Sequence, residues 1–249
     1  MIRGLYTAGT GMLTQNKKMD VITNNIANLE TAGFKQDKLL SRSFEDMLIT
    51  RINDPGIVLQ EREVGPLNTG THIDQVITDF TIGPLEETNL STDLALVGDG
   101  FFVVNTPDGE MYTRNSAFQL DENMRIVNSD GYALQGDNGD ITLTSDDFVV
   151  DSMGNVINEG NIISTIRVVN FENLDAIRKT GNNLYDSMGE AVIDSNATIR
   201  QGFREASNVD LIEQIVDMIE VSKTFESNQK VIQTLDDTLG KAVNDIGRI

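Results

Sequence analysis

The sequence has no cysteine, no tryptophan and a single histidine among its 249 residues. Without cysteine there are no disulfide bonds, no thiolate metal sites and no cysteine nucleophile. The one histidine, His72, could form half of a dyad with Asp74, but a histidine in a surface loop is the simpler interpretation. A serine–histidine triad is therefore excluded, and the chain contains neither a G-x-S-x-G motif nor a phosphate-binding loop.

Long apolar runs are also missing. No stretch of about 18 apolar residues exists, so direct insertion into a membrane is not expected. The first twenty residues, MIRGLYTAGTGMLTQNKKMD, contain neither a continuous apolar segment nor an A-x-A site. We therefore expect no cleaved signal peptide, and export, if it occurs, must use another route.

The net charge of −20 lies almost entirely in the middle of the chain. Residues 41–200 carry nine Lys or Arg against 27 Asp or Glu, whereas residues 1–40 carry five against three and residues 201–249 five against nine. A chain this acidic repels phosphate backbones, so nucleic acid is not an expected partner. We interpret the acidic residues as a solvated outer surface.

The acidic stretch 128–147 does not fit a calcium loop. An EF-hand needs a glycine at position 6 and an oxygen ligand at position 1. Each glycine that could take position 6 places Ile126, Leu134 or Val149 at position 1. The stretch GDGFF (98–102) lacks the third glycine of a dinucleotide fingerprint. The sequence therefore predicts no metal, no cofactor and no catalytic residue.

Residues 5–29 follow a heptad pattern that predicts a helix with a coiled-coil contact face. Three glycines, Gly4, Gly9 and Gly11, lie in the same segment, where each costs about 1 kcal/mol relative to alanine. We interpret these glycines as sites where neighbouring helices approach closely. The two heptad positions are occupied by Leu5, Met12, Met19 and Ile26, and by Ala8, Gln15, Ile22 and Leu29.

The C-terminal segment predicts a second helix of about 40 residues. Ser207 and Asp210 have the spacing of a capping box at its start. Apolar residues then recur at intervals of three and four, with an interruption of the phase at residues 224–229. The apolar positions are Ile212, Ile215, Ile219, Ile232, Leu235 and Leu239.

Between these helices the chain changes character. Ser43 and Asp46 suggest another capping box, followed by a short amphipathic helix that carries Phe44, Met47, Leu48 and Ile52. Short strand-like pieces separated by turn residues come next and predict an antiparallel β domain. These pieces are residues 57–64, 73–82, 94–105, 111–114, 125–135, 141–145, 148–157 and 165–171.

Four stretches, in order, resemble the bacterial flagellar rod and hook proteins, and together they cover about half of the chain. LYTAGTGMLTQNKKMDVITNNIANLETAGFK (5–35) is similar to the N-terminal signature of that family, and FEDML…DPG (44–56) to the segment that follows it in distal rod members. Residues 92–136, beginning TDLALVGDGFFVVN, resemble the shared β-domain motif, and residues 201–246 resemble the C-terminal helix. The stretch after Asp151 is shorter and more acidic than is usual for distal members.

The resemblance implies an α+β fold: long N- and C-terminal helices forming a coiled-coil tube domain, with an antiparallel, mainly-β domain inserted between them. The implied domains are residues 1–35 with 201–249, a connecting segment 36–75, and an outer β domain 76–200. The implied function is that of a structural subunit of the flagellar rod, most like the distal rod, polymerising into a hollow drive shaft. The chain would be located in the basal body, outside the cytoplasm.

The resemblance also implies partners: further copies in a helical homo-oligomer, other rod and hook subunits, and the flagellar type III export apparatus, with surrounding ring proteins as further candidates. The residues predicted to form subunit interfaces are Leu5, Met12, Met19, Ile22, Ile26, Ile212, Ile215, Ile219, Ile232, Leu235 and Leu239. Asn24, Asn25 and Asn28 are candidates for polar contacts between helices, although exposed asparagines are common near helix ends.

Three alternatives stay open on the sequence alone. The chain could be a proximal rod subunit, because those share the same ends. It could instead be a scaffold or cap of the axial structure that does not polymerise. The third is a cell-wall enzyme with two carboxylates in a cleft, since paired acids become visible only in a fold.

Overall fold

A computed structural model describes residues 2–51 and 62–246 of the chain. Two compact units form from interleaved segments. Unit 1 consists of Met1–Asn24, Asp37–Ile77 and Leu211–Ile249, and unit 2 of Asn25–Gln36 and Thr78–Asp210. Each unit is described separately below.

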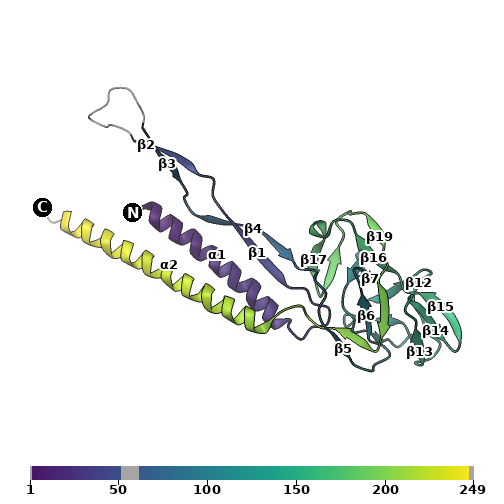
Figure 1. Cartoon of the computed structure of the whole chain (residues 1–249). Coiled ribbons are helices and arrows are strands. Elements are labelled where there is room, and N and C mark those ends of the chain that lie inside the picture. Colours follow the sequence, from purple (N-terminus) through teal and green to yellow (C-terminus); the bar gives the residue numbers. More distant parts are fainter. Residues whose placement is uncertain (1, 52–61, 247–249) are drawn as a thin grey trace. The chain divides into compact units, whose positions relative to one another are not determined.

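Two long helices run side by side in unit 1, in opposite directions (Figure 1). They are α1, Ile2–Ala27, and α2, Leu211–Ile246. Both were predicted from the heptad pattern, and α2 continues without a break through residues 224–229. The capping box predicted for α2 is wrong: Ser207 Oγ accepts a hydrogen bond from the Val209 amide, 3.3 Å away, in a turn that precedes the helix.

The predicted fold class is wrong in its helical part. Among the described residues there are two α-helices, one near each end of the chain, and a large, mostly β region between them, with no coiled-coil tube. The heptads suggested that both helices bury a complete contact face. Instead, much of that face is exposed, as at Ile212, Ile215 and Ile219. A heptad pattern identifies an apolar face but not whether the same chain covers it.

The remainder of unit 1 is an extended ribbon of four strands. These are β1 (Asp37–Ser43), which pairs with β4 (Thr71–Thr78), and β2 (Met47–Arg51), which pairs with β3 (Arg62–Leu67). The short helix predicted to follow Ser43 is therefore wrong, and Ile52, its last predicted residue, lies outside the described residues. So does most of the predicted strand 57–64, whose end corresponds to β3.

Unit 2 is an antiparallel β domain, as predicted. Its largest sheet has ten strands, and a separate sheet has the order β13-β14-β15. Residues 141–145, predicted as a strand, make only an isolated bridge between Thr142 and Arg125. A short 3₁₀ helix covers Leu174–Ala176. The strands are β5 (Leu85–Glu87), β6 (Leu94–Val97), β7 (Phe101–Thr106), β8 (Gly109–Thr113), β9 (Gln119–Leu120), β10 (Ile126–Val127), β11 (Ala133–Gly136), β12 (Gly139–Asp140), β13 (Phe148–Val150), β14 (Asn155–Asn158), β15 (Asn161–Thr165), β16 (Val168–Phe171), β17 (Arg178–Gly181), β18 (Leu184–Asp186), β19 (Val192–Asp194), β20 (Thr198–Gln201) and β21 (Phe203–Glu205).

Alternating residues of β7 build the two hydrophobic cores of unit 2. Phe102 and Val104 point into the larger core, which also buries Leu134 and Val156. Phe101 and Val103 point to the opposite side, where Phe101 packs against the rings of Phe80, Phe171 and Tyr185. A strand buried on both faces reads as a continuous apolar run, which explains the sequence FFVV at residues 101–104.

The abrupt stop after α1 follows from the glycine at position 33. Gly33 has φ +64°, a left-handed conformation that favours glycine, and its amide donates to the Glu205 carbonyl oxygen over 2.8 Å. A Cβ here would overlap the Arg114 carbonyl oxygen. Only glycine lets the chain pass this close to strand residues 113 and 114, so the helix ends where unit 2 begins.

A buried cluster of three charges lies beside Gly33. Glu205 is fully buried and accepts from Lys35 Nζ at 2.5 Å through Oε1 and from Arg114 Nε at 2.8 Å through Oε2. Lys35 also donates to the Thr81 carbonyl oxygen at 2.7 Å. Burial lowers the pKa of the Lys35 ammonium, and the Glu205 carboxylate opposes this shift. Two cations thus share one carboxylate, in a part of unit 2 that holds the chain segments next to both long helices.

Candidate subunit interface on the two terminal helices

The contact between α1 and α2 is made at small residues of α1. A Cβ at Gly4 would lie 3.4 Å from Leu235 Cδ1, and one at Gly11 would lie 3.1 Å from the Asn228 side chain. Gly4 and Gly11 are seven residues apart, as are Leu235 and Asn228, so the contact repeats every two turns of an antiparallel pair. Two of the three glycines therefore allow close approach of a neighbouring helix; Gly9 has no atom within 4 Å.

Only part of the predicted interface set is buried in this helix pair. Ile22 on α1 is buried, as is Ala8 of the same heptad position. On α2, Gln214 and Val221, which the sequence analysis did not select, are each only 2% exposed. They are seven residues apart and continue the Asn228–Leu235 spacing, which is the signal that could have identified them. The half-buried members of the predicted set are Met12, Met19, Ile26, Ile232, Leu235 and Leu239.

The N-terminal part of α2 presents an exposed aliphatic stripe. Its members are Ile212, Ile215, Val216 and Ile219, which we call the α2 stripe; their exposed fractions are 75, 44, 58 and 49%. The spacing of three and four residues places all of them on one face of the helix. Three were predicted, and Val216 was missed because it falls outside the heptad. The structure therefore shows an apolar helix face that the chain itself does not cover.

A second uncovered apolar surface lies on α1. Leu5 and Met12 line a groove of about 620 Å³ together with Leu13 of α1 and Phe225 of α2. Leu5 is 40% and Leu13 69% exposed. The heptad pattern put Leu5 and Met12 on the contact face with Ala8, whereas the Gly4–Gly11 contact turns them toward this groove instead. We call it the α1 groove.

The three candidate asparagines have different surroundings. Asn25 is 1% exposed, Asn24 is exposed and Asn28 is half-buried. Asn28 Oδ1 accepts from Thr31 Oγ1 at 3.3 Å, within the turn that ends α1. Asn28 therefore has a local role at the helix end, and a polar contact to a second subunit stays a prediction for all three.

One face of α1 holds the ribbon through threonines. Thr7 Oγ1 donates to the Thr69 carbonyl oxygen at 3.0 Å, and Thr14 Oγ1 lies 3.3 Å from Thr71 Oγ1. Between them Gly70, with φ +147°, is so close to Thr10 that a Cβ would overlap its hydroxyl. Beside this contact the His72 ring stacks on Phe44 at 5.1 Å, while Asp74 pairs with Arg42 at 2.8 Å, so His72 and Asp74 form no dyad.

Replacing Gly70 by alanine is expected to separate this turn from α1. The added Cβ overlaps Thr10, and the positive φ disfavours any L side chain. We expect a loss of about 1–3 kcal/mol in the stability of unit 1. Hydrogen exchange of the α1 amides and those of residues 69–71 measures it, and protection unchanged from wild type would contradict the prediction. Gly65→Ala, also at positive φ but without a neighbour within 4 Å, is the matched control.

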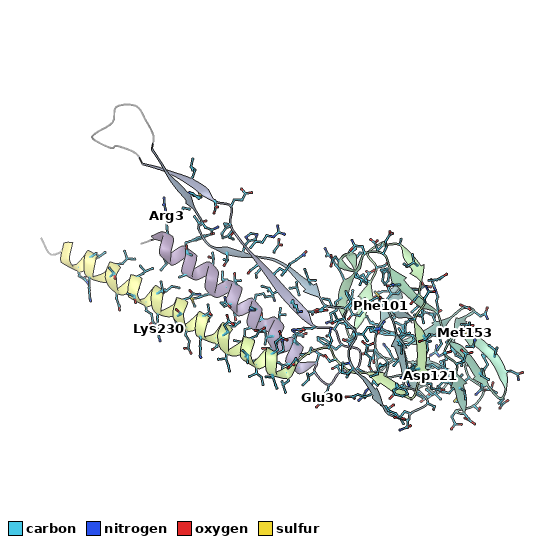
Figure 2. The ribbon with its side chains drawn as sticks, in the orientation of Figure 1. Arg3, Glu30, Phe101, Asp121, Met153 and Lys230 are labelled. Carbon is cyan, nitrogen blue, oxygen red and sulfur yellow. The ribbon has the colours of Figure 1, made fainter. Side chains whose placement is uncertain are left out.

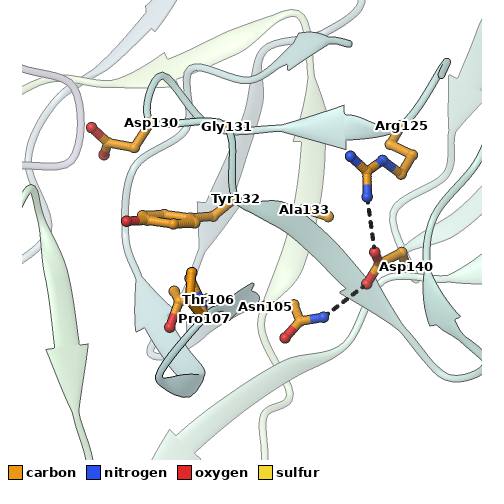
Figure 3. Close-up of a pocket in the computed structure, with 9 residues that line it drawn as sticks. All are labelled: Asn105, Thr106, Pro107, Arg125, Asp130, Gly131, Tyr132, Ala133 and Asp140. Atoms are coloured by element: carbon orange, nitrogen blue, oxygen red, sulfur yellow. Dashed lines mark hydrogen bonds and ion pairs between the residues drawn. The ribbon is translucent and has the colours of Figure 1, made fainter. Parts of the chain in front are cut away.

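A polar hollow of about 310 Å³ on unit 2 was examined as a site (Figure 3). Asp140 accepts from Asn105 Nδ2 at 3.4 Å and pairs with Arg125 at 3.5 Å. Arg125 also binds Asp121, and hydrogen bonds from the Arg125 amide and guanidinium lower the pKa of Asp121. The charges lining the hollow neutralise one another, and we assign it no function.

Three family models match the chain in sequence order. The model described as "Flagella basal body rod protein" covers residues 5–35, "Flagellar hook protein FlgE/F/G D1 domain" covers 95–165, and "Flagellar basal body rod FlgEFG protein C-terminal" covers 200–245. The flagellar basal-body rod protein FlgG of Borreliella burgdorferi is 33% identical over 98% of both chains. This chain belongs to the flagellar basal-body rod protein family.

Other relatives carry related names. The flagellar hook-basal body complex protein FlhO of Bacillus subtilis is 34% identical over the full length of both chains, and FlgF of Caulobacter vibrioides is 29% identical. This rod-family chain is a structural subunit of the flagellar basal body and not an enzyme, which confirms the predicted family and function. It assembles with other flagellar axial subunits. None of the described helices has both the length and the apolar character needed to cross a membrane.

Proposed function

We propose that this rod subunit polymerises with copies of itself and with related axial subunits through the α2 stripe and the α1 groove, and that it belongs to the distal rod. The single observation that carries the interface is the α2 stripe: four aliphatic side chains on one helix face, 44–75% exposed. Contiguous apolar surface of this kind marks an interaction site in a soluble protein. The likeness to FlgG proteins over nearly the whole chain supports the distal assignment.

The stripe provides enough apolar surface to matter. Full burial of one aliphatic side chain contributes about 1.5–3 kcal/mol. Four such residues on each subunit, repeated along an axis, offset the entropy lost on association only when several neighbours are present. Contacts between different surfaces of identical subunits continue along an axis without closing, which produces a filament.

We further infer that the subunit functions outside the cytoplasm after passage through the flagellar type III export apparatus. Membership of the rod family supports this location, because the axial structure continues beyond the inner membrane. Surrounding ring proteins remain candidate partners of its outer surface. A test of export is the appearance of the chain in the periplasm or medium of wild-type cells and its retention in cells without that apparatus.

The interface is tested by single-cysteine labelling. The wild-type chain has no cysteine, so each variant has one thiol. Leu13→Cys reports on the α1 groove and Ile212→Cys on the α2 stripe, because both side chains are well exposed in the single chain. We expect maleimide labelling to fall by about tenfold or more in isolated basal bodies relative to the purified monomer, because interfaces exclude water.

The matched control is Asp108→Cys, at the exposed turn between β7 and β8 in unit 2. It should be labelled at similar rates in the monomer and in the basal body. Equal labelling of Leu13→Cys and Ile212→Cys in both states would contradict the proposed interface. Because motility of each variant is measured in parallel, loss of labelling through failed assembly is distinguished from protection.

A further inference from the structure

The outer face of the small sheet β13-β14-β15 in unit 2 carries a row of aliphatic residues. Val149 of β13 lies opposite Ile157 of β14, which lies opposite Ile162 of β15. We call these three residues the aliphatic row. Val149 is 56% and Ile162 65% exposed, whereas the residues on the other face of the sheet, such as Val156, are buried in the core.

Acidic side chains border the row on both sides. Asp147 and Glu159 are exposed and stand at the strand ends next to the Phe148–Asn158 pair. On the other side Asp151 accepts from Asn155 Nδ2 at 2.8 Å, and Asn155 Oδ1 accepts from Thr165 Oγ1 at 3.0 Å. The hydrogen bonds from Asn155 lower the pKa of Asp151, so this carboxylate stays charged at neutral pH.

The charge around this sheet has one sign. Residues 126–166 contain seven Asp or Glu and no Lys or Arg. Met153, in the β13–β14 turn, is 80% exposed and adds apolar surface at the same end of the domain (Figure 2). Complementarity therefore requires a partner with apolar residues flanked by cations.

A second copy of unit 2 is a poor source of those cations. Most of its Lys and Arg residues are already engaged within the unit. Lys35 and Arg114 are buried with Glu205, Arg125 binds Asp121, Arg167 binds Glu110 and Lys179 lies over the Phe34 ring. Two acidic sheets facing each other would also repel.

We infer that the aliphatic row docks a different protein, whose contact surface presents apolar side chains flanked by Lys or Arg. The apolar row supplies the contact area, and Asp147, Asp151 and Glu159 supply orientation and selectivity against acidic surfaces. This surface belongs to unit 2 alone, so the inference does not depend on the helix faces proposed above as subunit interfaces.

The test places the photo-crosslinking amino acid p-benzoylphenylalanine at Ile162 and isolates basal bodies after irradiation. We expect a crosslink to a polypeptide other than this chain, with the attached peptide next to Lys or Arg in that partner. The yield should fall several-fold when salt is raised from about 0.1 M to about 1 M, because the Debye length shortens from about 10 to about 3 Å. The charge reversal Asp147→Lys/Glu159→Lys should lower it similarly.

The matched control carries the same amino acid at Ile193 of β19, an aliphatic residue 46% exposed on a different sheet of unit 2. Its crosslinking to the same partner should be at least about fivefold weaker if the row is the docking site. Crosslinks only to copies of this chain, equal yields at Ile162 and Ile193, or yields insensitive to charge reversal would each overturn the inference. Circular dichroism of each purified variant checks that unit 2 is folded.

Discussion

Glu205→Gln is expected to be among the most destabilising single substitutions in unit 2. The amide keeps the size of the side chain but removes the only charge that compensates Lys35 and Arg114, all three being at most 4% exposed. Removing one partner of a buried ion pair costs about 3–5 kcal/mol, because the remaining charge is buried without compensation. At 2–4 °C per kcal/mol for a domain of this size, the melting temperature of unit 2 should fall by about 10 °C.

The stoichiometry of the cluster makes the prediction sharper. With one carboxylate between two cations, Lys35→Met leaves a neutral Arg114–Glu205 pair and should therefore cost less than Glu205→Gln. A remaining cost is expected, because the Thr81 carbonyl oxygen loses its hydrogen bond from Lys35 Nζ. Calorimetry of the full-length chain, with the near-ultraviolet signal of buried Tyr185 as the probe for unit 2, measures both variants.

The matched control for this experiment is Glu86→Gln. Glu86 pairs with Arg204 at 3.7 Å on the same β5–β21 strand pair, but the two side chains are 58% and 38% exposed. An exposed ion pair contributes below about 1 kcal/mol. If Glu205→Gln melted within a degree or two of wild type, as this control should, the buried cluster would have no role in stabilising unit 2.

The buried cluster could not be predicted from the sequence. Lys35 and Glu205 are separated by 170 residues, and nothing local distinguishes either from a surface charge. The one signal was indirect: Gly33, beside Lys35, marks a place where backbones approach closely. A glycine shows that something is near but not which residue.

The elements that could be predicted are those defined by local periodicity. The two helices and the antiparallel character of the middle region were correct because heptads and turn residues act over a few positions. The segment after Ser43 failed because its capping-box spacing favours a helix locally, whereas pairing of β1 with β4 and of β2 with β3 favours strands. Tertiary pairing of this kind overrides local preference.

The same limit explains the mixed outcome for the interface residues. The heptads correctly identified apolar helix faces, but one pattern merged two surfaces. Leu235 faces Gly4 in the same chain, whereas Ile219 is 49% exposed on the α2 stripe. Sequence spacing treats the two positions alike, and the structure separates them.

That separation leads to a prediction with a large effect on motility. Ile219→Lys should leave the monomer folded, because the ammonium stays in water, yet prevent assembly, because burying an unpaired charge at a subunit contact costs several kcal/mol. Ile219→Leu, which preserves the apolar face, is the matched control and should support motility. Motility in soft agar, the yield of basal bodies and the thermal melt of the purified monomer are the three measurements.

Leu235→Lys should act differently, and the contrast decides between the two roles. Leu235 Cδ1 lies 3.4 Å from where a Cβ at Gly4 would be, so a lysine here disturbs the contact between α1 and α2 before any neighbour is involved. We expect lower thermal stability of the monomer for Leu235→Lys and an unchanged melt for Ile219→Lys, with motility lost in both. If Ile219→Lys cells swam normally, the α2 stripe would not be a subunit interface, whatever the Leu235 variant did.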